Sequence, residues 1–305
     1  MREHRDLLTI SDLTRAEAQE LFSSAAMYKK TSPPPTLKGK AVVLLFEKAS
    51  TRTRLSFEVG VARLGGHPIV LTPAGSQMSR GEPLRDTARV LSGYTDCIVM
   101  RTFGHDRIQE MAQWADVPVI NALTDLQHPC QVMADCFTLQ EIFGTVEGKK
   151  AAWIGDGNNM ANSWIEAATL LNFDLAIACP EGYDPDPEVV RIARDKGAHI
   201  SIVRDPKEAV EGALAVNTDV WASMGQEDEA EFRHRAFKGF EVNAKLMAVA
   251  HKDAVFMHCL PAHRGEEVSE EVLEGSRSVV WQQAQNRLYI QEAIMDFLLR
   301  YSRKE

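Results

Sequence analysis

The sequence predicts an α/β protein with two similar domains, each with a central parallel sheet flanked by helices. Along the chain of 305 residues, short apolar runs of strand length alternate with segments of helical periodicity. A Gly-Lys pair leads into one such run at 39–40 and into another at 148–149, and each run is followed by a polar turn and a helical segment. The chain therefore reads as two α/β halves of one design, with a boundary expected at 144–148.

The first half begins with an expected helix at 7–30, capped near Ser11, and a stiff connector at 31–36 that contains three prolines. Strands are expected at 41–46, 68–71, 97–100 and 117–120. Further helices are expected directly after the first strand, at 84–93, and from Pro129, which suits a first helical turn. The run at 41–46 is apolar throughout, which is typical of a strand buried on both faces of a sheet.

The second half continues the alternation of strands and helices. Strands are expected directly after 148–149 and at 175–179, 200–203, 214–218 and 254–257. Helices are expected at 187–196, at 206–211 and within 232–251. The chain ends in an amphipathic helix that follows Gln283.

Composition excludes several classes of protein. A hydrophobic share of 45% and a charged share of 25% are typical of globular domains, and a formal charge of -9 disfavours nucleic-acid binding. The apolar runs are too short to span a membrane, and the N-terminal residues resemble neither a signal nor a transit peptide, so we expect a cytoplasmic protein. Five cysteines without a CxxC pair argue against disulfides and a structural zinc site.

The strongest local signal lies in the turn after the first strand. Ser50 or Thr51 suits a helix N-cap, so unpaired main-chain N–H groups should lie next to the hydroxyls of Ser50, Thr51 and Thr53. Arg52 and Arg54 add positive charge, and this combination favours an anion such as phosphate. The alternative is that the two arginines only solvate an exposed helix end.

The segment FEKASTRTR, which contains this turn, resembles the carbamoyl phosphate signature of the aspartate/ornithine carbamoyltransferase family. Other motifs of the first half resemble that family in the same order. The resemblance implies that Arg101 in MRTF and His128 in HPCQ bind the carbamoyl oxygen, that Gln131 holds the carbamoyl amine, and that Arg287 in the last helix binds the phosphate. Gln77 in GSQ is implied to reach the site of a neighbouring subunit.

The turn GDGNN in the second half has two interpretations. It could begin a dinucleotide fingerprint of the G-x-G-x-x-G type, but Met160 stands where the third glycine should be. It also resembles the ornithine-binding half of the family, which implies that Asn159 contacts the amino acid.

The motif DVWxSMG resembles the ornithine branch of the family. It implies that Asp219 binds a substrate amine and that Ser223 and Met224 lie on a loop that closes over the site. Taken alone, Asp219 would be read as a helix N-cap.

HCLPAHRG also resembles the ornithine branch, with Cys259 on the side-chain amine and the Leu260 carbonyl on the carbamoyl amine. By the same resemblance, the bond from Leu260 to Pro261 is expected to be cis. Alternatively, Cys259 could be a small core residue, or a hydrolase nucleophile beside His258 and His263.

Together these resemblances imply transfer of the carbamoyl group from carbamoyl phosphate to the side-chain amine of L-ornithine, as in arginine biosynthesis. Residues 1–145 with the returning helix 285–305 are expected to bind carbamoyl phosphate, and residues 146–284 to bind ornithine. The expected catalytic residues are Arg52, Thr53, Arg101, His128 and Cys259. The resemblance implies no metal, no cofactor and a homotrimer with shared sites; putrescine, N-acetylornithine and aspartate remain alternative acceptors.

Overall fold

The computed structural model describes residues 4–72, 81–222 and 229–301. Its contacts divide the chain into two compact units: unit 1 comprises residues 1–134 and 285–305, and unit 2 comprises residues 135–284. The predicted fold class, with parallel sheets flanked by helices and a C-terminal helix that belongs to the first unit, is confirmed. None of the described helices combines the length and apolar character needed to cross a membrane.

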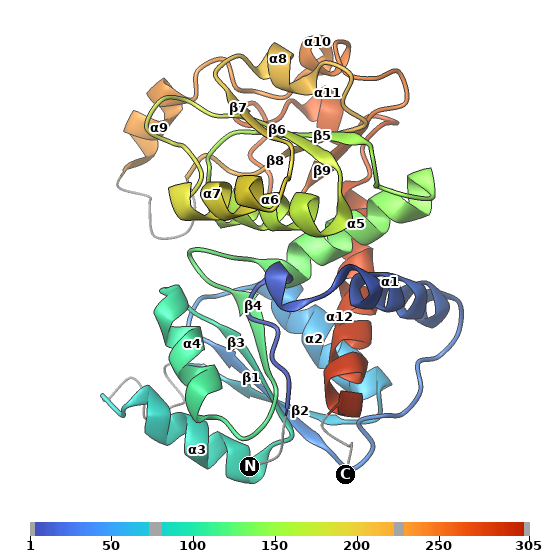
Figure 1. The fold of residues 1–305 in the computed structure, drawn as a ribbon, viewed down its shortest axis with the longest axis vertical. Helices are drawn as coiled ribbons and strands as arrows, with labels where there is room; N and C mark the ends of the chain where they lie inside the picture. The colour runs from blue at the N-terminus through green and yellow to red at the C-terminus, as the bar shows by residue number, and fades with distance from the viewer. Residues whose placement is uncertain (1–3, 73–80, 223–228, 302–305) are drawn as a thin grey trace. The chain divides into compact units, whose positions relative to one another are not determined.

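Unit 1 contains a four-stranded sheet in which every neighbouring pair of strands is parallel, in the order β2-β1-β3-β4 (Figure 1). Its strands are β1 (Ala41–Phe46), β2 (His67–Leu71), β3 (Cys97–Arg101) and β4 (Val119–Leu123). The bounds of β1 are those predicted, because the strand is an unbroken run of six apolar residues with polar residues on both sides.

The helices of unit 1 cover both faces of this sheet (Figure 1). They are α1 (Arg15–Lys30), α2 (Thr51–Arg63), α3 (Leu84–Tyr94), α4 (His105–Trp114), the start of α5 (Pro129–Phe143) and most of α12 (Val280–Tyr301). Val43 and Leu45 of β1 share a buried cluster with residues of α3 and α4. Because side chains alternate along a strand, Val42 and Leu44 face the opposite side, where α2 packs against β1.

The first helix differs from the prediction. Residues Ile10–Asp12 form a separate 3₁₀ turn, and α1 starts at Arg15 with Thr14, not Ser11, as its N-cap. The main-chain N–H of Glu17 donates to the Thr14 hydroxyl at 3.3 Å, and that of Thr14 donates to the Glu17 carboxylate at 2.8 Å. This reciprocal capping box outweighs the single cap that Ser11 could offer.

Two further differences concern the segment around β3. Arg101 is the last residue of the strand instead of following it, and α4 at His105–Trp114 was not predicted. Helix α4 is short, at 10 residues, and its buried residues are Ile108 and Met111.

Unit 2 contains a five-stranded parallel sheet in the order β7-β6-β5-β8-β9 (Figure 1). Its strands are β5 (Lys150–Ile154), β6 (Asp174–Ala178), β7 (Ile200–Val203), β8 (Ala215–Thr218) and β9 (Val255–His258). All lie within a residue or so of the predicted ranges, since each is a short apolar run bounded by polar turns.

The helices of unit 2 also lie on both faces of its sheet (Figure 1). They are α6 (Asn159–Leu171), α7 (Pro187–Asp195), α8 (Pro206–Val210), α9 (Ala230–Ala236), α10 (Ala244–Met247) and α11 (Glu270–Leu273). One face carries a large buried cluster that includes Phe237 and Phe256. Strand residues of the other face, such as Trp153, are also fully buried, so this sheet is covered on both sides.

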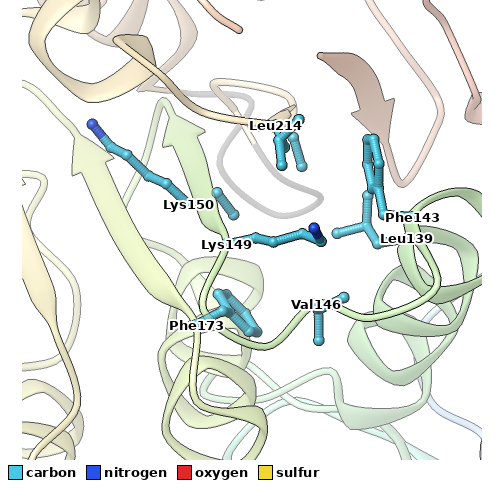
Figure 2. Close-up of a pocket in the computed structure, with 9 residues that line it drawn as sticks. Leu139, Phe143, Val146, Lys149, Lys150, Phe173 and Leu214 are labelled. Atoms are coloured by element: carbon cyan, nitrogen blue, oxygen red, sulfur yellow. The ribbon is translucent and has the colours of Figure 1, made fainter. Parts of the chain in front are cut away.

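A small apolar pocket lies at the amino ends of β5 and β8 (Figure 2). Leu139, Phe143 and Phe173 line it, and the Lys149 side chain extends across it. Its free volume of about 20 Å³ has room for a water molecule but not for an amino acid. It also lies at the edge of the sheet opposite to the carboxyl strand ends, where ligands of parallel sheets bind.

Helices α2 and α12 approach closely around a buried carboxyl group. A Cβ on Gly60 of α2 would lie 3.3 Å from Cγ of Glu292, so glycine allows the close contact. The Glu292 side chain is fully buried, and Nε of Arg63 lies 2.9 Å from its Oε1. Burial nevertheless raises the pKa of Glu292 to about 7, although the positive charge of Arg63 opposes this.

The raised pKa of Glu292 predicts that stability falls as pH rises. The folded protein holds this proton more tightly than the unfolded chain, so the stabilisation is complete below the ordinary pKa of 4.5 and is lost as pH passes about 7. We expect the free energy of unfolding, measured in urea, to fall between about pH 5 and about pH 8 in the wild type. This fall should be about 2–3 kcal/mol larger than the fall in Glu292→Gln over the same pH range. Parallel pH profiles for the two proteins would contradict this.

Candidate functional site

Polar side chains in both units gather where the strand order reverses. In unit 1 the order turns at β1, and the segment Ser50–Arg54 follows β1 while Arg101 ends the neighbouring β3. The register pairs Phe46 with Arg101, so both groups lie at the same carboxyl edge. Crevices at such reversal points are the usual ligand sites of open parallel sheets.

The N-terminus of α2 carries several groups that favour an anion. Ser50 is its N-cap, and the Ser50 hydroxyl accepts a hydrogen bond of 3.2 Å from the main-chain N–H of Thr53. Thr51 is exposed, Arg52 is half-buried and Thr53 is buried. The positive end of the helix dipole, the hydroxyls and the guanidinium of Arg52 therefore occupy one turn.

A buried arginine joins three segments of unit 1. Nη2 of Arg287 in α12 donates to the Thr53 hydroxyl at 2.9 Å, and its Nη1 donates to Oε1 of Gln131 in α5. With the Gln291 amide assigned so that its oxygen faces Arg287, that oxygen accepts from Nη2 and Nε at 3.1 Å. Arg287 is only 3% exposed, so this network sets the orientation of its guanidinium.

His128 lies beside two of these positive charges and is neutral. It precedes α5 and is 5% exposed. Burial lowers its pKa well below the ordinary value, and the charges of Arg287 and Arg101 lower it further. A neutral imidazole can donate one hydrogen bond without adding a third positive charge.

Unit 1 therefore brings together most of its predicted ligand residues. Thr53, Gln131 and Arg287 are in direct contact, and the charges of Arg101 and Arg287 act on His128. Arg101 itself is 8% exposed. Gln77 lies outside the described residues, as do Ser223 and Met224 of unit 2.

In unit 2, strand register places Asp219 next to Cys259. Thr218 at the end of β8 pairs with His258 at the end of β9, so the residues that follow are neighbours. The Cys259 thiol donates to Oδ1 of Asp219 at 3.0 Å, and the Asn158 amide donates to Oδ2 at 3.1 Å. Asp219 does not cap a helix; its carboxylate lies among polar groups at the edge of the sheet.

The predicted ligand Asn159 is the half-buried first residue of α6, and its neighbour Asn158 was missed by the sequence analysis. Asn158 caps α6 by accepting from the N–H groups of Met160 and Ala161, while its amide nitrogen binds Asp219. The cap could have been read from the sequence, because Asn is a preferred N-cap. The bond to Asp219 could not, because the two residues are far apart in the chain.

Glu267 was also missed. Its side chain is completely buried, and its Oε1 accepts from Nε2 of His258 at 3.1 Å and from the main-chain N–H of His263 at 2.6 Å. His258 Nδ1 in turn accepts from the N–H of Leu260 at 2.8 Å, which assigns the ring proton to Nε2. Glu267 thus holds the loop that contains Cys259 and Leu260.

Leu260 has an unusual backbone in this loop. Its φ is +60°, and the bond to Pro261 is cis, as predicted. A leucine in the left-handed region is rare, and such strain occurs often where a main-chain group is aimed at a ligand.

A buried ion pair supports the turn after β5. Arg233 of α9 is 7% exposed and donates to the Asp156 carboxylate at 2.7 Å and to the Trp221 carbonyl at 2.9 Å. Burial raises the pKa of Asp156 from its ordinary value, although Arg233 opposes this shift. Arg233 thus connects α9 with the turn after β5 through Asp156, and with the segment after β8 through the Trp221 carbonyl.

The geometry of the GDGNN turn does not favour a dinucleotide. A Cβ on Gly157 would lie 2.2 Å from the main-chain nitrogen of Pro185, so glycine is needed for contact with the protein's own loop. Met160 is buried at 2% exposure, where a fingerprint requires a small residue.

Comparison with known proteins identifies both units. Residues 5–141 match the family described as aspartate/ornithine carbamoyltransferase, carbamoyl-P binding domain, and residues 147–298 match the Asp/Orn binding domain of the same family. The ornithine carbamoyltransferase of Geobacter metallireducens is 54% identical over 301 residues, which cover 97% of this chain and 99% of that relative. That of Nitratidesulfovibrio vulgaris is 59% identical over 263 residues, or 86% of this chain and 88% of the relative.

Solved structures give the same result. The ornithine carbamoyltransferase from Pyrococcus furiosus superposes with a TM-score of 0.93 at 46% identity and covers 97% of each chain. The anabolic ornithine carbamoyltransferase from Campylobacter jejuni superposes with a TM-score of 0.91 at 42% identity, covering 96% of this chain and 98% of that one.

The contact at Gly157 predicts a loss of stability on adding a single methyl group. Because the nearest obstacle is main chain, Gly157→Ala should lower the free energy of unfolding by about 2 kcal/mol or more. Gly93→Ala is the matched control: a Cβ there meets nothing within 4 Å on helix α3, so we expect no loss or a small gain. Equal urea stability of the two variants would be inconsistent with a close contact at Gly157.

Proposed function

Because the chain belongs to the aspartate/ornithine carbamoyltransferase family, we propose that it transfers the carbamoyl group of carbamoyl phosphate to the side-chain amine of L-ornithine. The products are L-citrulline and phosphate. The observation that carries this proposal is the contact of Thr53 and Gln131 with the buried Arg287, beside the neutral His128. Such a set of fixed donors and positive charges suits a small phosphorylated ligand.

Unit 1 holds carbamoyl phosphate in this proposal. Ser50, Thr51 and Thr53 offer hydroxyl groups and main-chain N–H groups to the phosphate at the start of α2, and Arg52 adds a guanidinium. Arg287 completes the phosphate ligands. Gln131 is proposed to bind the carbamoyl amine. The carbonyl of Leu260, a residue of unit 2, remains a predicted ligand of that amine.

The carbamoyl oxygen gains negative charge as the amine attacks. Arg101, His128 and Thr53 are proposed to donate hydrogen bonds to that oxygen, and their positions are set before the reaction by burial. Since His128 is neutral, it acts as a hydrogen-bond donor that retains its proton and not as a general acid.

Unit 2 holds ornithine. Asn159 and Asp219 are proposed to bind the amino acid, and Cys259, which donates to Asp219, contacts the side-chain amine. Ser223 and Met224, together with Gln77 from a neighbouring subunit, remain predicted ligands. Asn158 and Glu267 hold Asp219 and the loop of Cys259 in position.

The reaction needs positioning and charge stabilisation above all. The neutral side-chain amine forms a C–N bond with the carbonyl carbon, and the C–O bond to phosphate then breaks. The departing phosphate can accept the proton that the amine loses, so we assign no general base and require no metal or cofactor. A homotrimer with shared sites, a cytoplasmic location and a role in arginine biosynthesis remain predictions from the family.

Removal of the half-buried guanidinium at the start of α2 should abolish most of the activity. We expect Arg52→Ala to lower kcat/KM for carbamoyl phosphate about 100-fold or more, because a charge-assisted hydrogen bond to phosphate is lost. Arg54→Ala is the matched control, since Arg54 is exposed and donates to Glu58 at 3.1 Å, and it should stay within about threefold of the wild type. Similar losses in both variants would refute the assignment.

Acceptor choice should depend on Asp219. Citrulline and phosphate should appear together with ornithine, and putrescine, N-acetylornithine and aspartate should react far more slowly. Asp219→Asn should lower kcat/KM for ornithine roughly tenfold to 100-fold and leave KM for carbamoyl phosphate nearly unchanged, because a charged partner of the amine is removed. Asp174→Asn, an exposed carboxylate beside His199, is the control. Faster turnover of another acceptor would revise the substrate.

A further inference from the structure

Strand β9 lies at an open edge of the sheet in unit 2 and ends at His258, directly before Cys259. On the side away from β8, its main-chain groups need partners outside the sheet. The N–H of Phe256 donates to the Arg277 carbonyl at 2.8 Å, and the Phe256 carbonyl accepts from the N–H of Val279 at 3.0 Å. Because alternate residues of a strand direct their main-chain groups to the same side, the N–H of His258 also faces this open edge.

The side chain of Gln283 accepts from that N–H. Gln283 lies near the start of α12 and is completely buried, as is Asp135 of α5. Oε1 of Gln283 accepts from the main-chain N–H of His258 at 2.9 Å, and its Nε2 donates to Oδ1 of Asp135 at 2.8 Å. A main-chain N–H can only donate, so these partners fix the orientation of the amide. All three residues belong to unit 2.

This contact lies at the base of the loop that carries a predicted ornithine ligand. Cys259 follows His258 directly, and its thiol donates to Oδ1 of Asp219 at 3.0 Å. On the open side of the strand, the main chain of His258 is held by Gln283. A shift of the main chain at His258 would therefore move the thiol of Cys259 relative to the Asp219 carboxylate.

We propose that Gln283 and Asp135 are positioning residues for ornithine: they hold the end of β9 so that Cys259 meets Asp219. This inference rests on the proposed function, which gives Cys259 and Asp219 their roles. Gln283 and Asp135 themselves are not substrate ligands in this proposal. They act through the main chain of His258, and a buried polar pair that served folding alone would not change how ornithine is used.

The two helices that this pair joins also carry residues proposed to bind carbamoyl phosphate. Arg287 lies one helical turn after Gln283 in α12. Gln131 lies one turn before Asp135 in α5. The buried polar groups of the two helices pair in order: Gln131 with Arg287, and Asp135 with Gln283. Because the first pair does not involve Gln283, a change of Gln283 should leave the carbamoyl phosphate residues in place.

Steady-state kinetics of Gln283→Met test the proposal, because methionine keeps the length of the side chain but removes both hydrogen bonds. We expect kcat/KM for ornithine to fall about tenfold or more, while KM for carbamoyl phosphate stays within about threefold of the wild type. Gln282→Met is the matched control, since Nε2 of Gln282 donates to the exposed Glu141 of the same helix α5 at 3.1 Å. Its kinetic constants should stay within about twofold of the wild type.

A reciprocal double variant, Asp135→Asn with Gln283→Glu, should restore the function. It keeps the shape and the total charge of the pair: the new amide donates to the new carboxylate, which still accepts from the N–H of His258. We expect kcat/KM for ornithine within about threefold of the wild type. Circular dichroism and Tm are measured for each variant, and a double variant that regains Tm but not kcat/KM would show that the pair serves folding alone.

The thiol of Cys259 gives a readout that does not depend on turnover. Cys259 is half-buried, and the other cysteines of the chain are buried: Cys97, Cys130, Cys136 and Cys179. A disulfide reagent such as DTNB therefore reports on Cys259 in the folded protein. We expect the thiol to react about fivefold or more faster in Gln283→Met, because its hydrogen bond to Asp219 is weakened, and at the wild-type rate in Gln282→Met.

Two results would overturn the proposal. One is wild-type kcat/KM for ornithine together with wild-type thiol reactivity in Gln283→Met. The other is a double variant that stays as impaired as Gln283→Met. If the wild type forms no citrulline at all, the proposed function fails instead, and the thiol measurement still decides whether Gln283 positions Cys259.

Discussion

The burial of one guanidinium group organises unit 1. Arg287 carries a permanent charge and is 3% exposed, so its donors must be satisfied by the protein. Side-chain oxygens of Thr53 in α2, Gln131 in α5 and Gln291 in α12 accept hydrogen bonds from Arg287. The requirement therefore aligns three helices that are far apart in the sequence. Burial of His128, and then the charges of Arg287 and Arg101, lower the pKa of that imidazole and keep it neutral.

Parallel strand register plays the corresponding part in unit 2. Residues that directly follow paired strand ends are neighbours. The register of β8 and β9 alone therefore brings Cys259 within hydrogen-bonding distance of Asp219. What the register does not supply is the direction of the loop after β9. Glu267 sets the direction of this loop by accepting hydrogen bonds from His258 and from the main-chain N–H of His263. Leu260, which lies between these two residues, has a left-handed backbone.

The sequence predicted local features better than distant ones. The bounds of β1 and the cap at Ser50 follow from neighbouring residues, and both agree with the structure. The predicted cap of α1 at Ser11 was wrong, because Thr14 lies close by and forms a capping box with Glu17. The short helix α4, of 10 residues, was missed. The contacts of Asn158 and Glu267 depend on how the chain folds back on itself, which neither spacing nor propensity reports.

The place of Arg287 in the chain has a consequence for synthesis. Thr53 and Gln131 leave the ribosome long before residue 287 is made, so during most of translation their contacts with Arg287 cannot form. All four strands of the first unit precede residue 124, whereas the guanidinium that joins α2 and α5 is added only with the last helix. A translation product that ends before residue 287 would therefore lack the contacts that join α2 and α5 to α12.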